Sequence, residues 1–231
     1  MARTCLSMVI SLCLLGLWMV TPASAQGLLG SGYSDSEFVY YRPNDANLNR
    51  LDHFIHGVQS NVNLPLLRNG DSYFGLDAYG RFRGLWMAHS EGSPQLDTGV
   101  RSLNANFYDY SGGTNLYFRG WQNVRPWIGA GYHHSDVRLK GQLDGDHFSN
   151  RDREDGFLFT VGVEANVFPM LAVRHSLEFQ TAKFNGSDFE NPDYLAELII
   201  SPPMNHWYLR LGGFIDFDGN GGGLAGLGVR F

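Results

Sequence analysis

Apolar and polar residues alternate with a period of two along most of the chain from about Phe54 onward. Successive side chains of a β-strand point to opposite faces, so this period predicts strands with one apolar and one polar face rather than amphipathic helices. The last segment is the clearest case. Its apolar positions are Ala225, Leu227, Val229 and Phe231, and its alternate positions are Gly226, Gly228 and Arg230.

Ten segments share this alternation, and each is long enough for a tilted transmembrane strand of about 9–11 residues. They lie near 54–66, 72–86, 99–110, 115–123, 127–138, 156–168, 171–183, 193–201, 206–217 and 223–231. The pattern predicts an all-β fold: a transmembrane, antiparallel, up-and-down β-barrel over residues 51–231, with about ten strands. Eight or twelve strands stay open. Residues 26–50 are predicted to form an irregular N-terminal arm, although Tyr40-Tyr41 could instead begin another strand.

Composition narrows the class of protein. Charged residues make up 17% of the chain, below the roughly 25% usual for soluble domains, while 29 glycines and 14% aromatic residues suit a turn-rich β protein. The net charge of −6 argues against a nucleic-acid partner. Beyond the N-terminal segment, no apolar run is long enough for a spanning helix, so a membrane location requires a closed barrel.

The first 25 residues have the features of a secretory signal peptide. Arg3 provides the positive charge, Val9–Val20 is the apolar stretch, and Ala23-Ser24-Ala25 offers small residues for cleavage. Cleavage would remove both cysteines of the chain, Cys5 and Cys13. Disulfides and cysteine-ligated metals are therefore not expected in the exported chain, and we predict neither a cofactor nor a metal site.

Alternation alone also fits a soluble, lipocalin-like barrel that points its apolar face inward. The low charge content and the aromatic C-terminus favour the membrane barrel. An arginine that faces mid-bilayer lipid costs about 2–4 kcal/mol, so the charged residues of the strands must then face the lumen. The lumen charge network predicted in this way contains Asp77, Arg81, Arg83, Arg119, Glu164, Arg174, Glu178, Glu197, Arg210 and Arg230.

Connection lengths and tryptophans suggest an orientation. Long and short connections alternate in the second half of the chain, as in barrels with long outer loops and short periplasmic turns. The segment 88–97 is an exception, because it is long where a short periplasmic turn is expected. An aromatic girdle is predicted at the periplasmic strand ends, since indole prefers the membrane interface. It consists of Trp86, Trp121, Trp127 and Trp207.

Two short motifs resemble those of bacterial outer-membrane proteins. The C-terminal Leu227-Gly228-Val229-Arg230-Phe231 resembles the signal that the barrel-assembly machinery reads in that family, and the resemblance assigns this role to Leu227, Val229 and Phe231. The segment Pro126–Tyr132 is similar to a strand of small barrels of the outer-membrane-protein-A type. The resemblance implies an outer-membrane location with lipid as a partner. Small members of that family usually have eight strands, whereas ten are counted here.

Candidate chemistry is sparse. His133 and Ser135 share one strand face and are similar to the His-x-Ser of outer-membrane lipid A deacylases, but His147 stands where that family has its glutamate, and Glu154 is a weak substitute. An omptin-like protease would need a cluster at the outer rim, drawn from Asp109, His134, Asp136 and Asp216. Two acidic segments could bind Ca²⁺, although a solvated outer loop at 139–155 and a hairpin turn at Asp216–Asn220 are the simpler interpretation.

The sequence therefore predicts an exported, integral outer-membrane barrel with a structural or surface-interaction role. Its outer loops would meet a surface ligand, and a narrow lumen would pass small solutes at most. No catalytic residue is assigned. The first alternative is a barrel-embedded hydrolase that uses His133 and Ser135. The second is the soluble lipocalin-like binding barrel.

Overall fold

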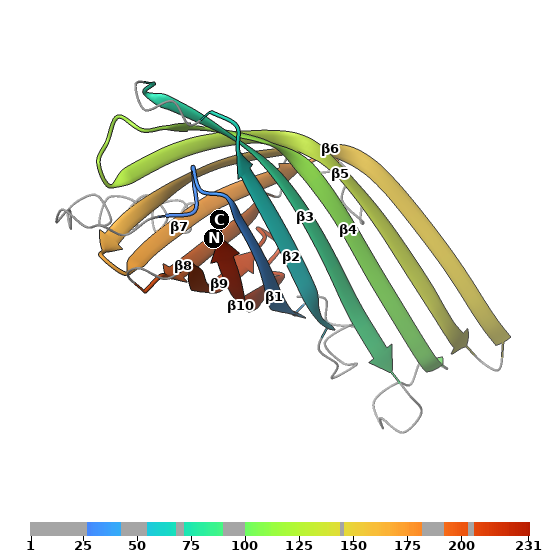
Figure 1. Cartoon of the computed structure of the whole chain (residues 1–231). Helices are drawn as coiled ribbons and strands as arrows, with labels where there is room; N and C mark the ends of the chain where they lie inside the picture. The colour runs from blue at the N-terminus through green and yellow to red at the C-terminus, as the bar shows by residue number, and fades with distance from the viewer. Residues whose placement is uncertain are drawn as a thin grey trace.

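The chain folds into a closed antiparallel barrel of ten strands, seen in a computed structural model (Figure 1). The structure describes residues 27–42, 55–67, 72–89, 100–143, 146–181, 192–202 and 206–231. The predicted signal peptide lies outside these residues. The strands are β1 (Tyr33–Arg42), β2 (Ile55–Pro65), β3 (Phe74–His89), β4 (Val100–Phe118), β5 (Val124–Leu143), β6 (Asp146–Phe168), β7 (Leu171–Gln180), β8 (Asp193–Ile200), β9 (Trp207–Ile215) and β10 (Gly221–Arg230).

Each strand pairs with its sequence neighbours, and β1 pairs with β10 to close the barrel. The backbone N–H of Phe231 donates to the carbonyl of Gly32 at 2.9 Å, so the two ends of the described chain meet at one rim. We call this rim the terminal end and the opposite rim the far end. Closure leaves no unpaired strand edge in the barrel wall, which confirms the predicted fold class and strand count.

The two faces of the wall differ as the alternation predicts. Outward positions carry exposed apolar side chains, among them Val62, Leu116, Ile128, Phe159, Val161, Leu211 and Leu227. Inward positions carry buried polar and charged side chains, which fill the lumen. Exposed aromatic rings border the apolar belt at both ends: Tyr73, Phe74, Trp121 and Trp207 at the terminal end, and Tyr110, Tyr132 and Phe157 toward the far end.

Strands β3–β6 are much longer than the others. They have 16 to 23 residues, whereas the remaining six have 8 to 11. Because they pair side by side, they extend beyond the far end as a four-stranded sheet on one side of the barrel (Figure 1). We call this extension the β3–β6 wall.

Two of the predictions about strands are wrong: one strand was missed, and another was predicted as two. The two errors cancel in the total number of strands. Residues 26–50 do not form an irregular arm throughout, because Tyr33–Arg42 is strand β1. The segments 99–110 and 115–123 belong to one strand, β4. The Gly112-Gly113 pair between them is not a turn. A Cβ at Gly113 would lie 2.2 Å from the carbonyl oxygen of Ala130 on β5, so glycine here permits close approach of neighbouring strands.

The added first strand reverses the direction expected for 54–66 and 72–86. Strand β3 therefore ends at the far end, and the long connection 88–97 joins two far ends instead of two terminal ends. The expected outer loop 139–155 is also wrong in part, because β5 and β6 continue through it as a hairpin to Leu143 and Asp146. The described residues contain no helix that is long and apolar enough to cross a membrane.

Candidate functional site: the filled lumen

Arg210 lies at the centre of the lumen and binds three carboxylates from two strands. Its guanidinium contacts Asp35 (3.0 Å) and Glu37 (3.1 Å) on β1, and Nε donates to Glu197 on β8 at 2.6 Å. Glu197 also faces Arg174, with 3.7 Å between the nearest N and O atoms. All five side chains are buried. Buried charges are tolerated only when they are compensated, and here two guanidinium groups face three carboxylates, so neutral donors must supply further contacts.

Neutral donors complete the coordination of the two β1 carboxylates. Asn61 donates to Asp35 at 2.6 Å, Gln59 donates to Glu37 at 2.8 Å, and the Tyr208 hydroxyl donates to Asp35 at 2.7 Å. The Glu37 side chain needs room on the neighbouring strand. A Cβ at Gly226 of β10 would lie 2.6 Å from Glu37 Cγ, so glycine at this inward position admits the carboxylate.

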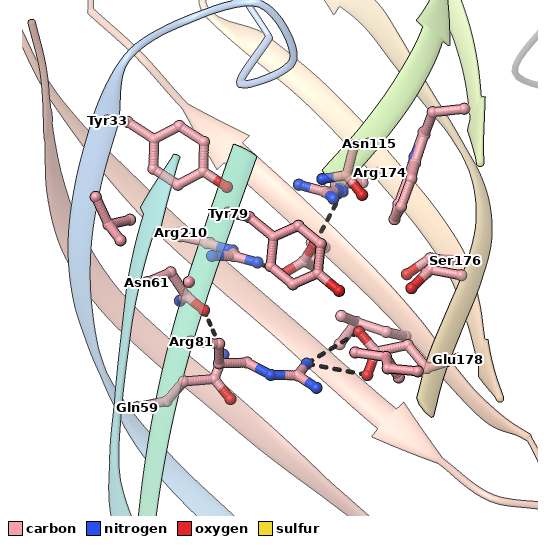
Figure 2. A pocket seen from close by; sticks show the side chains of 17 residues that line it. Tyr33, Gln59, Asn61, Tyr79, Arg81, Asn115, Arg174, Ser176, Glu178 and Arg210 are labelled. Carbon is pink, nitrogen blue, oxygen red and sulfur yellow. Dashed lines mark hydrogen bonds and ion pairs between the residues drawn. The ribbon is translucent and has the colours of Figure 1, made fainter. Parts of the chain in front are cut away.

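A second ion pair crosses the lumen beside the first cluster. Arg81 on β3 donates from Nη1 to both oxygens of Glu178 on β7, each at 2.9 Å, and Nε donates to Ser111 at 3.2 Å. Arg83 donates to Gln59 at 2.8 Å and stacks over Phe214, 5.6 Å from the ring centroid. The Arg81–Glu178 ion pair joins opposite sides of the barrel through its centre (Figure 2).

A cavity of about 50 Å³ remains between the two clusters, enough for a few water molecules. Figure 2 shows its lining, which includes Tyr79, Asn115, Arg174 and Glu178. The Tyr79 hydroxyl and the Asn115 side-chain oxygen are buried and have no hydrogen-bond partner among the described residues. The cavity is therefore polar and small, and it does not provide a continuous channel.

Residues 27–31 form a turn that fills the terminal end of the lumen, and we call it the terminal turn. Glu164 accepts hydrogen bonds from the backbone N–H groups of Leu28 (2.9 Å) and Leu29 (3.2 Å), and Asp77 accepts one from Gly30 (2.8 Å). The carbonyl of Leu29 accepts a bond from Arg125 at 2.6 Å. The side chains of Leu28 and Leu29 are 0% and 2% exposed, so the turn is packed inside the barrel.

The far part of the lumen is apolar. Ile55, Met87 and Ala105 form a buried cluster, and partly buried side chains pack against it: Tyr41, Leu85, Leu103, Phe107 and Leu139. Tyr41 also stacks on Phe214, with 6.0 Å between ring centroids. The lumen is thus filled in three layers: the terminal turn, the ion pairs and this apolar cluster.

The predicted charge network divides between these layers. Arg81, Arg83, Arg174, Glu178, Glu197 and Arg210 lie in the central layer, whereas Asp77 and Glu164 hold backbone N–H groups of the terminal turn. Arg119 and Arg230 lie near the terminal rim, where they stack on Tyr117 and Tyr208.

Sequence reasoning missed Asp35 and Glu37 because they belong to the segment assigned to the arm. The Tyr40-Tyr41 pair was the available signal, because the first half of this strand is polar on both faces.

The four tryptophans of the expected girdle lie in different environments, and their contact with a membrane interface stays a prediction. Trp121 and Trp207 are exposed at the terminal end. Trp86 lies near the opposite end of β3, because β1 reverses the direction assumed for that strand. Trp127 is 5% exposed and points into the lumen, where Arg174 stacks on its ring at 4.6 Å.

Leu227, Val229 and Phe231 are exposed on the outer face of the last strand and its end, and their recognition by the assembly machinery stays a prediction.

His133 and Ser135 do face the lumen together, but their contacts do not form a nucleophilic relay. The Ser135 hydroxyl donates to Asp109 at 2.7 Å, and His133 Nε2 lies 3.5 Å from the same carboxylate oxygen. In a Ser-His-Asp triad the histidine accepts the serine proton. Here the carboxylate lies between them, so this arrangement does not activate the hydroxyl.

The Ser135→Ala variant is accordingly expected to leave membrane lipids unaltered. Mass spectrometry of lipid A from cells that produce either protein would measure the acyl chains. Identical profiles are expected, because the Ser135 hydroxyl donates to the Asp109 carboxylate and not to a histidine. Loss of a deacylated species in the variant would contradict this and revive the hydrolase alternative.

The remaining rim candidates do not converge. Asp109 faces the lumen, whereas His134 and Asp136 lie on the outer face of β5, where His134 pairs with Asp155 at 2.6 Å. Asp216 stabilises its own turn, because its carboxylate accepts hydrogen bonds from the backbone N–H groups of Asp218 (3.0 Å) and Asn220 (2.8 Å). These four residues therefore do not form an omptin-like cluster. Within the described ranges, no group of three metal-binding side chains comes together.

Asp136 is surrounded by arginines beyond the apolar belt. Arg151 binds both of its oxygens, Arg138 donates at 3.3 Å, and Arg153 lies at 3.7 Å. Hydrogen bonds from Arg151 and Arg138 hold the pKa of Asp136 well below its ordinary value, so its carboxylate remains ionised at neutral pH.

Comparisons with known proteins show which solved structures are similar to this chain. No protein-family model matches the chain, and no curated protein matches it by sequence. Among solved structures, the transport unit of the autotransporter AIDA-I from Escherichia coli matches with a TM-score of 0.54 and 11% identity, over 94% of this chain and 97% of that one. Ail, the attachment invasion locus protein of Yersinia pestis, matches with a TM-score of 0.41 and 14% identity (87% and 97% covered). The N-terminal barrel domain of Pseudomonas aeruginosa OprF gives 0.35 and 11% (87% and 99%).

The chain has the fold of bacterial outer-membrane β-barrel proteins. Of these three matches, AIDA-I exceeds a TM-score of 0.5, and at 11% identity it supports the barrel fold alone. The chemistry of this chain must be argued from its own residues.

Proposed function

We propose that this protein is an integral barrel of the bacterial outer membrane that carries the β3–β6 wall as a surface for contact with other molecules, and that it does not act as an open pore. Export by the segment Met1–Ala25 and assembly through the C-terminal strand belong to this proposal. The observation that carries it is the filled lumen: the terminal turn, the ion pairs around Arg210 and the apolar far cluster lie one above another.

The outer face supports the membrane part of the proposal. A belt of exposed apolar side chains between two aromatic borders matches the profile of a bilayer. In plain water the same belt would be a large exposed apolar surface, which soluble monomers avoid. The charged residues of the spanning region point inward, where they are paired, and this is the arrangement that a lipid exterior requires.

The extended strands support the contact role. Narrow transport would need no strands of 20 and 23 residues, whereas β5 and β6 hold their hairpin well beyond the far rim. Hydrogen bonding along the whole hairpin fixes its side chains on a rigid sheet. Such a wall can present a defined surface to a partner.

The proposal is tested by two measurements on the mature chain refolded in detergent and transferred to lipid. Co-flotation with vesicles and heat-modifiable gel mobility are expected for a membrane barrel. Planar bilayers are expected to show no stable current steps, in contrast to an open porin measured alongside. A compact monomer that stays in buffer without detergent would support the lipocalin-like alternative, and regular current steps would show that the lumen conducts.

A further inference from the structure

The outer face of the β5–β6 hairpin changes character where the apolar belt ends. Tyr132 on β5 and Phe157 on β6 are the last exposed aromatic residues of the belt, 51% and 61% exposed. Beyond them, the same face carries charged side chains on both strands. Their register has no shift, so residues of equal parity stay on the same face up to the tip. We call this surface the β5–β6 cationic face; its cations are Arg138, Lys140, Arg151 and Arg153.

The hairpin separates its charges between two faces. The sequence Arg151-Asp152-Arg153-Glu154 alternates in sign, and the strand places both arginines on the side of Phe157 and both acids on the side of the buried Leu158. The outer face holds four cations and two carboxylates, Asp136 and Asp155, which leaves an excess of two positive charges. This excess lies on a chain with a net charge of −6.

The cations on this face are not fully compensated by charged groups among the described residues. Arg138 and Arg151 stand directly opposite each other on paired strands, an arrangement of like charges that is unfavourable. One carboxylate, Asp136, lies between them and also faces Arg153. The three arginine side chains remain 43–55% exposed. A further anion bound on this face would relieve the repulsion and use the outward N–H donors.

The depth of the arginines identifies the source of that anion. Asp136 is four residues beyond Tyr132; at about 3.3 Å per residue and a tilt near 45°, it lies roughly 9 Å further along the membrane normal. Lipid headgroups occupy a layer of about 5–8 Å beyond each side of the hydrocarbon core. The three guanidinium groups gather around Asp136, at the outer limit of this layer. Long arginine side chains that point away from the barrel and reach back toward the membrane meet lipid phosphates there, and guanidinium groups match phosphate geometry.

We propose that the β5–β6 cationic face binds the phosphate groups of anionic lipid headgroups in the leaflet at the far end. This inference rests on the proposed function, because it requires the barrel to span a membrane. Lipid phosphate would fix the depth and rotation of the barrel and hold the β3–β6 wall upright at the surface.

The test uses the refolded full-length mature chain in detergent, with native mass spectrometry as the readout and diphosphorylated lipid A and phosphatidylcholine as the probes. Preferential binding of lipid A is expected. The double variant Arg151→Gln/Arg153→Gln should weaken lipid A binding about tenfold or more. The matched control Asp152→Asn/Glu154→Gln changes the same strand on its inner face and should not weaken it. Arg151→Lys/Arg153→Lys, which keeps the charge, should retain most of the binding.

Several outcomes would overturn the inference. Equal binding of lipid A and phosphatidylcholine would do so, as would equal loss in the outer-face and inner-face variants. Displacement of lipid A by inorganic phosphate at comparable concentration would identify a free-phosphate site instead of a lipid site. Heat-modifiable mobility and vesicle flotation of every variant keep folding separate from binding. Failure of the unaltered chain to float would contradict the proposed function, whereas flotation without phosphate preference contradicts this inference alone.

Discussion

Replacing Arg210 by alanine is expected to lower the free energy of unfolding by about 3–5 kcal/mol. The reason is the set of groups that the substitution leaves behind. Asp35, Glu37 and Glu197 all contact this guanidinium, and all three are 2–3% exposed. Without it they are buried carboxylates that repel one another, and Arg174 remains as one cation at the edge of the cluster.

Equilibrium unfolding in urea, followed by tryptophan fluorescence of the lipid-reconstituted barrel, would measure this loss. Arg42→Ala is the matched control, because Arg42 is an exposed arginine at the end of β1; a change within about 0.5 kcal/mol is expected there. Adding Glu197→Gln to Arg210→Ala should restore part of the stability by removing one uncompensated charge. An Arg210→Ala barrel as stable as the parent would refute the central ion-pair cluster.

Removal of the Glu164 carboxylate is expected to release the terminal turn. Glu164 accepts hydrogen bonds from the backbone N–H groups of Leu28 and Leu29. A hydrogen bond to a charged group contributes about 1.5–3 kcal/mol to stability. The equilibrium constant for opening of the turn should therefore rise in Glu164→Ala by about a hundredfold or more.

Thiol labelling can measure this opening, because the predicted mature chain has no cysteine. A Leu28→Cys reporter is placed at a side chain that is 0% exposed, so maleimide reacts with it only when the turn leaves the lumen. Labelling should be slow in the Leu28→Cys protein and much faster when Glu164→Ala is added. Leu67→Cys, at a position 47% exposed, should label at the same rate in both backgrounds. Equal rates at position 28 would mean that Glu164 does not hold the turn.

The outer face of the barrel could be predicted from the sequence because it obeys one physical rule. Residues such as Phe157, Phe159 and Val161 recur at every second position, and this period follows directly from strand geometry. The same rule assigned Arg210 and Glu197 to the lumen. It could not name their partners, because cross-barrel contacts depend on register and on side-chain length.

Strand β1 was missed for a physical reason. Its outward positions begin with Ser34 and Ser36, and its inward positions include Asp35 and Glu37, so both faces are polar over its first half. A polarity pattern cannot detect such a strand, although its backbone pairs fully with β2 and β10. The hairpin beyond Gly156 escaped detection in the same way, since Arg151 to Glu154 alternate in the sign of charge and not in hydrophobicity.

The tryptophan prediction shows how one topological error spreads. Trp86 was assigned to the wrong end because the direction of β3 depends on the number of strands before it. Trp127 was assigned to the right end and the wrong face, although its odd-numbered position on β5 matches that of the inward His133 and Ser135. A strict parity check along β5 would have placed it in the lumen.

The contact between Asp35 and Arg210 joins residues 175 positions apart, and this separation constrains the order of biogenesis. During translocation the first strand emerges long before the ninth. If β1 entered the hydrocarbon early, it would bring two carboxylates without their cation. For a barrel that inserts as proposed, β1 is therefore expected to enter the bilayer only together with β9, whose guanidinium makes the two carboxylates compatible with the hydrocarbon interior.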